Sequence, residues 1–218
     1  MKIFDTFTYF NEDLILDIRL NQLNEFVEKF VIVESTFTHS GERKKLNFDI
    51  NNFKKFSNKI TYIVLDNKPS NYLIIDSDES SESKTRKKIV NALILENYQR
   101  NGIQRGLVEA EENDLILISD VDEIPKLNSI NLNLVGNNLI FFIQHFFHYK
   151  FNLYLKELKH FGTKGCLKKK LLSPQWIRNI KNKKYSFFRF DTIFSKKKYR
   201  NIKIIKDGGW HFSNILNA

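Results

Sequence analysis

The stretch Leu115-Ile116-Leu117-Ile118-Ser119-Asp120-Val121-Asp122-Glu123 decides the fold class. Four consecutive apolar residues at its start are typical of a strand that is buried on both faces of a sheet. The strand brings two carboxylates, Asp120 and Asp122, to its carboxyl end. Ligands of open α/β sheets bind in the crevice beyond the carboxyl ends of the strands. The stretch therefore predicts an α/β protein with a ligand site at this strand end.

Strands and helices alternate on both sides of this stretch. Short β-branched or aromatic runs predict further strands over Ile3 to Tyr9, Phe30 to Val33, Ile60 to Leu65, Leu139 to Tyr149 and Ile202 to Ile205. Apolar spacing and capping residues predict helices after an N-cap at Asn11, over Asn47 to Phe56, over Thr85 to Val108 with a break near Gly102, and over Pro174 to Ile180. The segment from Asn67 to Ser83 is interpreted as a loop, and Phe151 to Lys170 receives no assignment. The alternation predicts a central sheet, parallel at least in its first half, flanked by helices.

Length and composition are those of a globular protein. The 218 residues are 42% hydrophobic and include 20 Phe, which is enough for one domain with a real core over residues 1–218. A single cysteine, Cys166, excludes an intrachain disulfide, and we interpret it as an ordinary small apolar residue because nothing marks a catalytic partner. The chain has no signal-peptide pattern and no apolar run that could span a bilayer, so we expect a soluble, cytoplasmic protein.

The net charge of +10 raises the question of an anionic partner. Basic residues concentrate late in the chain, at Lys168–Lys170, Lys181–Lys184 and Lys196–Lys198. Lysine predominates in these runs and no nucleic-acid-binding motif accompanies them, so no specific nucleic acid is expected. A weak association with anionic membrane or phosphosugar surfaces stays open.

Asp120 and Asp122 are candidate ligands of a divalent cation. Mn²⁺ and Mg²⁺ take oxygen ligands and bridge well to phosphates, where they neutralise charge on a diphosphate leaving group. An Asp-x-Asp triplet also occurs in ordinary turns, and the preceding strand is what favours a metal site here. Glu123 follows immediately, and its local sequence favours a general base and a solvated turn residue equally.

Four further residues are candidates for ligand contacts. His211 follows two glycines that permit close backbone approach, and imidazole suits Mn²⁺, while the adjacent Trp210 offers a face for stacking on a sugar. Glu34, at a strand end, is a candidate acceptor for a base or ribose, or else braces a loop. Arg100, on the long helix, either holds a phosphate or forms a surface ion pair. We interpret the remaining histidines of the aromatic strand region as core or rim polar groups: His145, His148 and His160.

The ordered set of short motifs resembles glycosyltransferase family 17. The motifs run from Phe4-Asp5-Thr6-Phe7 with Asn11-Glu12, through Ile18-Arg19-Leu20-Asn21, Val31-Ile32-Val33-Glu34-Ser35 with Thr38 and Gly41, Gln99-Arg100-Asn101, Ile118-Ser119-Asp120-Val121-Asp122-Glu123-Ile124-Pro125 and Ser173-Pro174-Gln175 with Arg178, to Gly209-Trp210-His211-Phe212-Ser213. They occur in family order and span nearly the whole chain. Each is weak alone, but the ordered set is specific.

The resemblance implies a GT-A fold with a donor-binding part over about residues 1–125 and an acceptor-side part over about 126–218. It implies a UDP-sugar donor, with UDP-GlcNAc expected, and inversion at the anomeric carbon during transfer to a glycan or lipid-linked glycan. Asp122 is then the main ligand of Mn²⁺ or Mg²⁺, Asp120 reaches the ribose or the metal, and His211 is a further metal or diphosphate contact. The resemblance places Glu34, Arg100, Asn101 and Trp210 at the donor.

An inverting transfer needs a base that deprotonates the acceptor hydroxyl. Glu123 and Asp207 are the candidates; the sequence assigns the role firmly to neither, and Asp207 is the poorer match to the motif pattern. Two other functions stay open beside this one. The first is a GT-A-type enzyme with another nucleotide-sugar donor, or a nucleotidyltransferase. The second is a basic binding protein with a degenerate site.

Overall fold

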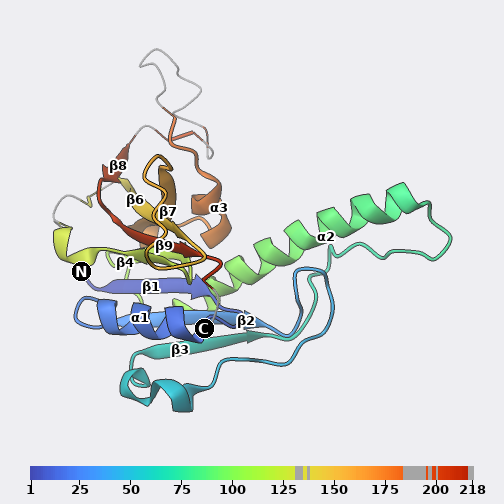
Figure 1. Cartoon of the computed structure of the whole chain (residues 1–218), viewed down its shortest axis with the longest axis horizontal. Coiled ribbons are helices and arrows are strands. Elements are labelled where there is room, and N and C mark those ends of the chain that lie inside the picture. The colour runs from blue at the N-terminus through green and yellow to red at the C-terminus, as the bar shows by residue number, and fades with distance from the viewer. Residues whose placement is uncertain (131–134, 137, 184–194, 196–197, 200, 216–218) are drawn as a thin grey trace.

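The computed structural model describes residues 1–130, 135–136, 138–183, 195, 198–199 and 201–215. Its strands are β1 (Ile3–Thr8), β2 (Lys29–Ser35), β3 (Ile60–Leu65), β4 (Leu115–Asp120), β5 (Glu123–Pro125), β6 (Leu139–His148), β7 (His160–Leu167), β8 (Ile202–Ile205) and β9 (Gly209–Ser213). Its α-helices are α1 (Asp13–Leu23), α2 (Ser81–Asn101) and α3 (Pro174–Asn179). Short 3₁₀ helices are η1 (Ile50–Phe56), η2 (Gly102–Gly106), η3 (Leu127–Ser129) and η5 (Lys168–Lys170). The elements form one large mixed sheet flanked by helices (Figure 1), which confirms the predicted α/β class.

The sheet has a parallel half and a mixed half. Its strand order is β3-β2-β1-β4-β7-β6-β9-β5, with β8 also pairing with β6. The first four strands in this order are parallel, and β1 lies between β2 and β4. The direction changes at β7, which is antiparallel to both β4 and β6. The predicted parallel first half is therefore confirmed, and the carboxyl ends of β1, β2 and β4 face the same edge.

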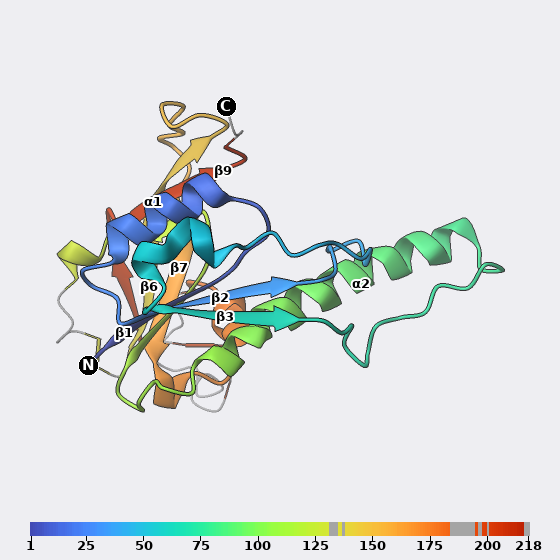
Figure 2. The same ribbon diagram turned by 90° about the horizontal axis from the view of Figure 1, so that it is seen from below.

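Both faces of the parallel half are buried, which explains the uninterrupted apolar runs of its strands. On one face, α1 and η1 pack on alternate strand residues such as Phe30, Ile32 and Leu117. On the other, η2 and α3 pack on the intervening residues, such as Val31 and Ile116. Figure 2 shows α1 and α2 on opposite sides of β1, β2 and β3.

The break predicted near Gly102 is confirmed, because α2 ends at Asn101 and continues as η2. A Cβ atom at Gly102 would lie 2.8 Å from a methyl of Leu65, so only glycine lets the helix end pack this closely on β3. The amino-terminal half of α2 extends beyond the sheet (Figure 1). None of the helices in the described ranges is both long enough and apolar enough to cross a membrane.

Several boundaries differ from the sequence predictions. The N-cap of α1 is Glu12, so the prediction of Asn11 was wrong by one residue; the Glu12 carboxylate instead accepts from the main-chain nitrogens of Phe10 and Asn11. The segment interpreted as a loop up to Ser83 ends earlier, because Ser80 caps α2 through its side chain. The strand β7 fell in the segment without an assignment. Part of the late lysine runs, at positions 184, 196 and 197, lies outside the described residues.

Cys166 is fully buried in β7, as expected for an apolar residue. Burial raises the pKa of its thiol to about 12, so the thiolate is scarce at neutral pH. These observations support the interpretation that Cys166 is not a nucleophile.

Candidate functional site

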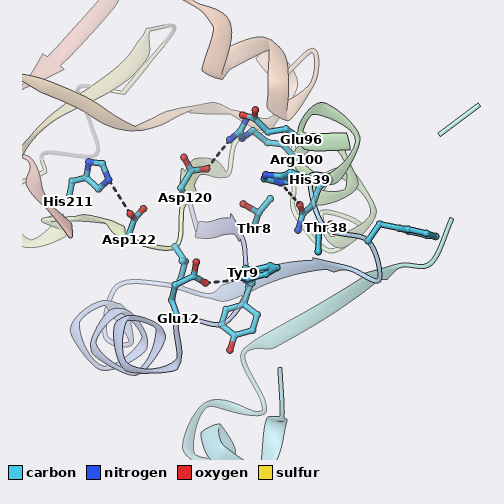
Figure 3. Close-up of a pocket in the computed structure, with 14 residues that line it drawn as sticks. Thr8, Tyr9, Glu12, Thr38, His39, Glu96, Arg100, Asp120, Asp122 and His211 are labelled. Atoms are coloured by element: carbon cyan, nitrogen blue, oxygen red, sulfur yellow. Dashed lines mark hydrogen bonds and ion pairs between the residues drawn. The ribbon is translucent and has the colours of Figure 1, made fainter. Parts of the chain in front are cut away.

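A cavity of about 510 Å³ opens at the carboxyl ends of the parallel strands. Thr8 at the end of β1 and Asp120 at the end of β4 are register partners, and both line it. Asp122, His211 and Arg100 lie around the same cavity (Figure 3). The structure thus brings together four of the residues that the sequence singled out, from three distant parts of the chain.

Much of the remaining lining is aromatic, and two further carboxylates, Glu12 and Glu96, lie beside it. Tyr9, Phe10 and Phe37 line this part of the cavity together with Thr38 and His39. The Tyr9 hydroxyl donates to Asp13 Oδ1 at 2.5 Å, which fixes the ring at the start of α1. A planar aromatic ligand group could lie against these rings, since aromatic rings favour offset or edge-to-face contacts.

Asp120 is held between two arginines. Its Oδ1 accepts from Arg100 Nη2 at 2.9 Å, and its Oδ2 accepts from Arg178 Nη2 at 3.0 Å. Arg100 is itself positioned by Glu96 at 2.9 Å and by the side-chain oxygen of Gln175 at 2.6 Å. The guanidinium of Arg100 is therefore buried at the cavity, while its carboxylate partners Glu96 and Asp120 stay 39% and 37% exposed.

Asp122 and His211 face each other across the junction of β5 and β9. The His211 Nε2 and Asp122 Oδ2 atoms are 3.1 Å apart, because β9 pairs antiparallel with β5 and sets His211 opposite Glu123. Burial alone would lower the pKa of His211, but the carboxylate of Asp122 outweighs it and raises the pKa above the ordinary value. The other ring nitrogen, Nδ1, is buried and has no hydrogen-bond partner among the described residues.

A buried arginine organises the loop that carries both aspartates. Arg19, on α1, is 0% exposed and makes a two-pronged ion pair with Asp5 at 2.7 and 2.8 Å. Its Nη1 donates to the main-chain carbonyls of Asp120, Val121 and Glu123 at 3.1, 3.0 and 2.9 Å. These bonds hold the loop carbonyls towards α1, on the side away from the cavity that the aspartate side chains line.

Glu123 is buried beneath this loop. Its carboxylate accepts from both Nη atoms of Arg178, at 2.7 and 3.0 Å, from His160 Nε2 at 2.9 Å and from the main-chain nitrogen of Asp120 at 3.0 Å. Burial alone would raise the pKa of Glu123, but Arg178 and His160 outweigh it and hold the pKa well below its usual range. Glu123 is therefore an ionised structural brace: both oxygens of its carboxylate accept hydrogen bonds from these neighbours.

The other predicted residues lie away from the cavity wall. Glu34 is buried and accepts from Lys44, from the main chain at 47–48 and from Tyr62, so it braces a loop. Asn101 accepts from the main-chain nitrogen of Gln175 at 3.0 Å. Trp210 lies in β9 and packs on the hydrophobic core beneath the sheet.

Asp207 lies on the turn between β8 and β9, with a φ of 50°. It accepts from His145 at 2.6 Å and from Lys126 at 2.7 Å, and its side chain is 60% exposed. These two partners lower its pKa. Neither the cavity nor the Asp122–His211 pair includes it, so its catalytic role stays a prediction, as does that of Glu123.

The donor chemistry of the cavity suits a divalent cation only in part. Asp122 and His211 present an oxygen and a nitrogen side by side, and a cation of this class keeps several waters and binds through one or two carboxylates plus substrate phosphates. Asp120 differs, because each of its oxygens already accepts from an arginine. Within the described ranges no three His, Cys, Asp or Glu side chains converge on one point. Asp122 and His211 thus fit a cation that a phosphate ligand completes.

The sequence did not single out several residues that build this site. Arg178 was noted only within a matching motif, and His160 was interpreted as a rim group. Arg19 carried no signal beyond its motif, because an arginine on an amphipathic helix is ordinarily solvent-exposed. Its position directly among buried apolar helix residues was the available hint.

Comparisons with known proteins agree with the motifs. The family model of glycosyltransferase family 17 matches residues 1–217. The human protein named beta-1,4-mannosyl-glycoprotein 4-beta-N-acetylglucosaminyltransferase is 27% identical over 120 residues, and so is the rat protein of the same name. In each case the matched region covers 53% of this chain and 20% of the relative. The chain therefore matches only about a fifth of the length of these curated relatives.

Proposed function

The chain belongs to glycosyltransferase family 17, and from this premise we propose that it is a metal-dependent, inverting transferase of the GT-A type. The proposed reaction moves GlcNAc from UDP-GlcNAc to a hydroxyl of a glycan, free or lipid-linked. The name of the human and rat relatives supports GlcNAc as the transferred sugar. The acceptor of those relatives is not carried over, because the match covers only a fifth of their length.

The Asp122–His211 pair is the observation that carries the proposal. It lies at the cavity, at the carboxyl end of a central strand, where α/β sheets bind their ligands. In the proposal these two side chains hold Mn²⁺ or Mg²⁺, which when bound supplies neutralisation of the charge on a diphosphate leaving group. Arg100 adds a fixed positive charge to the same cavity.

The size and lining of the cavity support binding of the donor through its nucleotide part. Its volume of about 510 Å³ lies in the range of small-molecule sites. Tyr9 and Phe37 offer aromatic surface for a base, and Thr38 and His39 offer hydrogen-bonding groups for a ribose. Uridine placed along these residues would bring its diphosphate towards Asp122 and Arg100.

The base of the inverting step is proposed among Glu123 and Asp207. Glu123 stays ionised, but all of its described contacts hold it in the brace beneath the loop. Asp207 is the more accessible of the two, and His145 and Lys126 keep it ionised. A base must reach the proton that it removes. Asp207 meets this requirement better because it is more accessible, whereas Glu123 meets it better because it lies nearer the cavity.

Calorimetry of UDP binding tests the proposal, with and without Mn²⁺. We expect binding only with the metal, and we expect Asp122→Ala and His211→Ala each to weaken it by at least about tenfold. Asp17→Ala is the matched control, because Asp17 is an exposed acid on α1 that does not line the cavity. An affinity for UDP that is the same with and without Mn²⁺, or that neither substitution changes, would refute the proposed metal site.

A further inference from the structure

A second pocket lies between α2 and α3, and its lining is neutral throughout. Its volume is about 430 Å³. Carboxamides dominate the lining, at Asn97, Asn101, Gln175 and Asn179, and the half-buried indole of Trp176 adds an apolar surface. No acidic or basic side chain lines it among the described residues, although 28% of the chain is charged. An uncharged pocket on so charged a protein calls for a neutral ligand.

We propose that this pocket binds a neutral saccharide and serves as an acceptor subsite, a role that rests on the proposed transferase function. Sugar hydroxyls both donate and accept hydrogen bonds, and a carboxamide offers two donors and an acceptor in one planar group. The apolar faces of a sugar ring pair with aromatic surface, which Trp176 supplies. Among the described residues, the lining of this pocket offers no cation to a phosphate or a carboxylate.

The carboxamides are partly tied to one another, and this fixes their orientation. Gln175 Nε2 donates to Asn179 Oδ1 at 2.9 Å, and the main-chain nitrogen of Gln175 donates to Asn101 Oδ1 at 3.0 Å. Both bonds use the oxygens of the asparagines, so their NH₂ groups remain to donate to a ligand. In the described part of the chain the Asn97 carboxamide makes no hydrogen bond. The pocket therefore keeps donors and acceptors available at defined positions.

One hydrogen-bonded chain joins this pocket to the donor cavity. Gln175 Oε1 accepts from Arg100 Nη1 at 2.6 Å, and Arg100 Nη2 donates to Asp120 at 2.9 Å. Gln175 lines the pocket, whereas Arg100 and Asp120 line the donor cavity. A saccharide in the pocket would thus lie beside the cavity in which the donor is proposed to bind.

Saturation-transfer NMR on the full chain tests the proposal. The probes are methyl β-GlcNAc, methyl α-mannoside, chitobiose and mannotriose at millimolar concentration, with uridine and inorganic phosphate as alternative ligands. We expect at least one saccharide to bind, and the exposed-residue variant Asn97→Ala/Asn179→Ala to weaken that binding about tenfold. Asn58→Ala, an exposed asparagine outside both cavities, should leave it unchanged.

Metal-dependent UDP binding, measured on the same variants, separates this inference from the proposed function. The double variant should bind UDP within about twofold of the unsubstituted chain, because neither residue lines the donor cavity. The pocket proposal is wrong, and the transferase proposal stands, if UDP binds but no saccharide does. The same holds if the double variant binds the saccharide as well as the unsubstituted chain does. Uridine or phosphate bound in a manner sensitive to the double variant would also overturn the pocket proposal. If a saccharide binds there and UDP binds nowhere, the pocket is real and the transferase function fails.

Discussion

Arg19 Nη1 donates to the main-chain carbonyl of Asp120 at 3.1 Å, from a helix that lies 101 residues earlier in the chain. Together with the bonds from Arg19 to the carbonyls of Val121 and Glu123, this contact makes α1 a structural support of the site. The loop that carries Asp120 and Asp122 is therefore held from beneath by a fixed, buried charge that Asp5 balances.

Replacing Arg19 should disturb the loop more than the helix. Arg19→Lys keeps the charge, but a single ammonium cannot reach Asp5 and three carbonyls together. We expect the free energy of unfolding to fall by about 3 kcal/mol, since buried donors and acceptors lose their partners. Urea unfolding measures this. Arg105→Lys, at an exposed arginine, should change stability little, and an equally small effect at Arg19 would contradict the supporting role.

Glu123 and Arg178 should behave as a coupled pair. Glu123→Gln leaves the guanidinium of Arg178 without its buried carboxylate, so we expect a loss of about 3 kcal/mol in the free energy of unfolding. Arg178→Met should cost a similar amount. The double variant should cost clearly less than the sum, because removing both members leaves no unpaired charge. Additive losses in denaturant unfolding would show that the two side chains act independently.

Gly209 should tolerate no side chain. Its φ is 129°, and a Cβ atom there would lie 2.1 Å from the carbonyl oxygen of Ile124. Gly209→Ala should lower the free energy of unfolding by about 2–3 kcal/mol and weaken metal-dependent UDP binding, since β9 carries His211. Gly136→Ala is the control, because its φ is also positive but no atom of the described residues lies within 4 Å of the added Cβ. It should cost about 1 kcal/mol and leave UDP binding intact.

Lys164 should make stability depend on pH above neutrality. Burial, with the nearby charge of Arg178, lowers the pKa of Lys164 to about 8, whereas in the unfolded chain it titrates near the ordinary lysine value of 10.5. Between these values the unfolded chain binds more protons than the folded one, so the contribution of Lys164 to stability rises with pH. The free energy of unfolding of the unsubstituted chain and of Lys164→Met should be measured by chemical denaturation at pH 7, 8, 9 and 10. Relative to Lys164→Met, the unsubstituted chain should become more stable as the pH rises. A flat difference would mean that Lys164 keeps its ordinary pKa.

The features that could be predicted from the sequence are those that the local residue pattern determines. The apolar run before Asp120 predicted β4, and the helix break at Gly102 followed from backbone preference alone. Aromatic and β-branched residues likewise predicted β6 to within one residue. The strand β7 escaped because Gly162 and Gly165 interrupt its pattern; Gly165 packs against Leu117 of the neighbouring strand, a contact that no local rule shows.

The partners of the site residues could not be predicted in this way. Asp120 and Asp122 were identified from their strand, but Arg178 reaches Asp120 across 58 residues and His211 reaches Asp122 across 89. Glu123 was left between a base and a turn residue because the partners of its buried carboxylate, Arg178 and His160, lie far from it in the sequence. Such pairings follow from tertiary packing, and only the three-dimensional arrangement reveals them.

The place of β1 between β2 and β4 has a consequence for how the chain is made on the ribosome. β1 and β2 are synthesised early, yet the second edge of β1 stays open until β4 emerges about eighty residues after the end of β2. At about 5–20 residues per second, the nascent chain carries this unpaired apolar edge for several seconds. During that interval Asp5 and Arg19 already exist but have no aspartate loop to hold. Chaperone binding to the nascent chain should therefore concentrate on lengths that precede the appearance of β4.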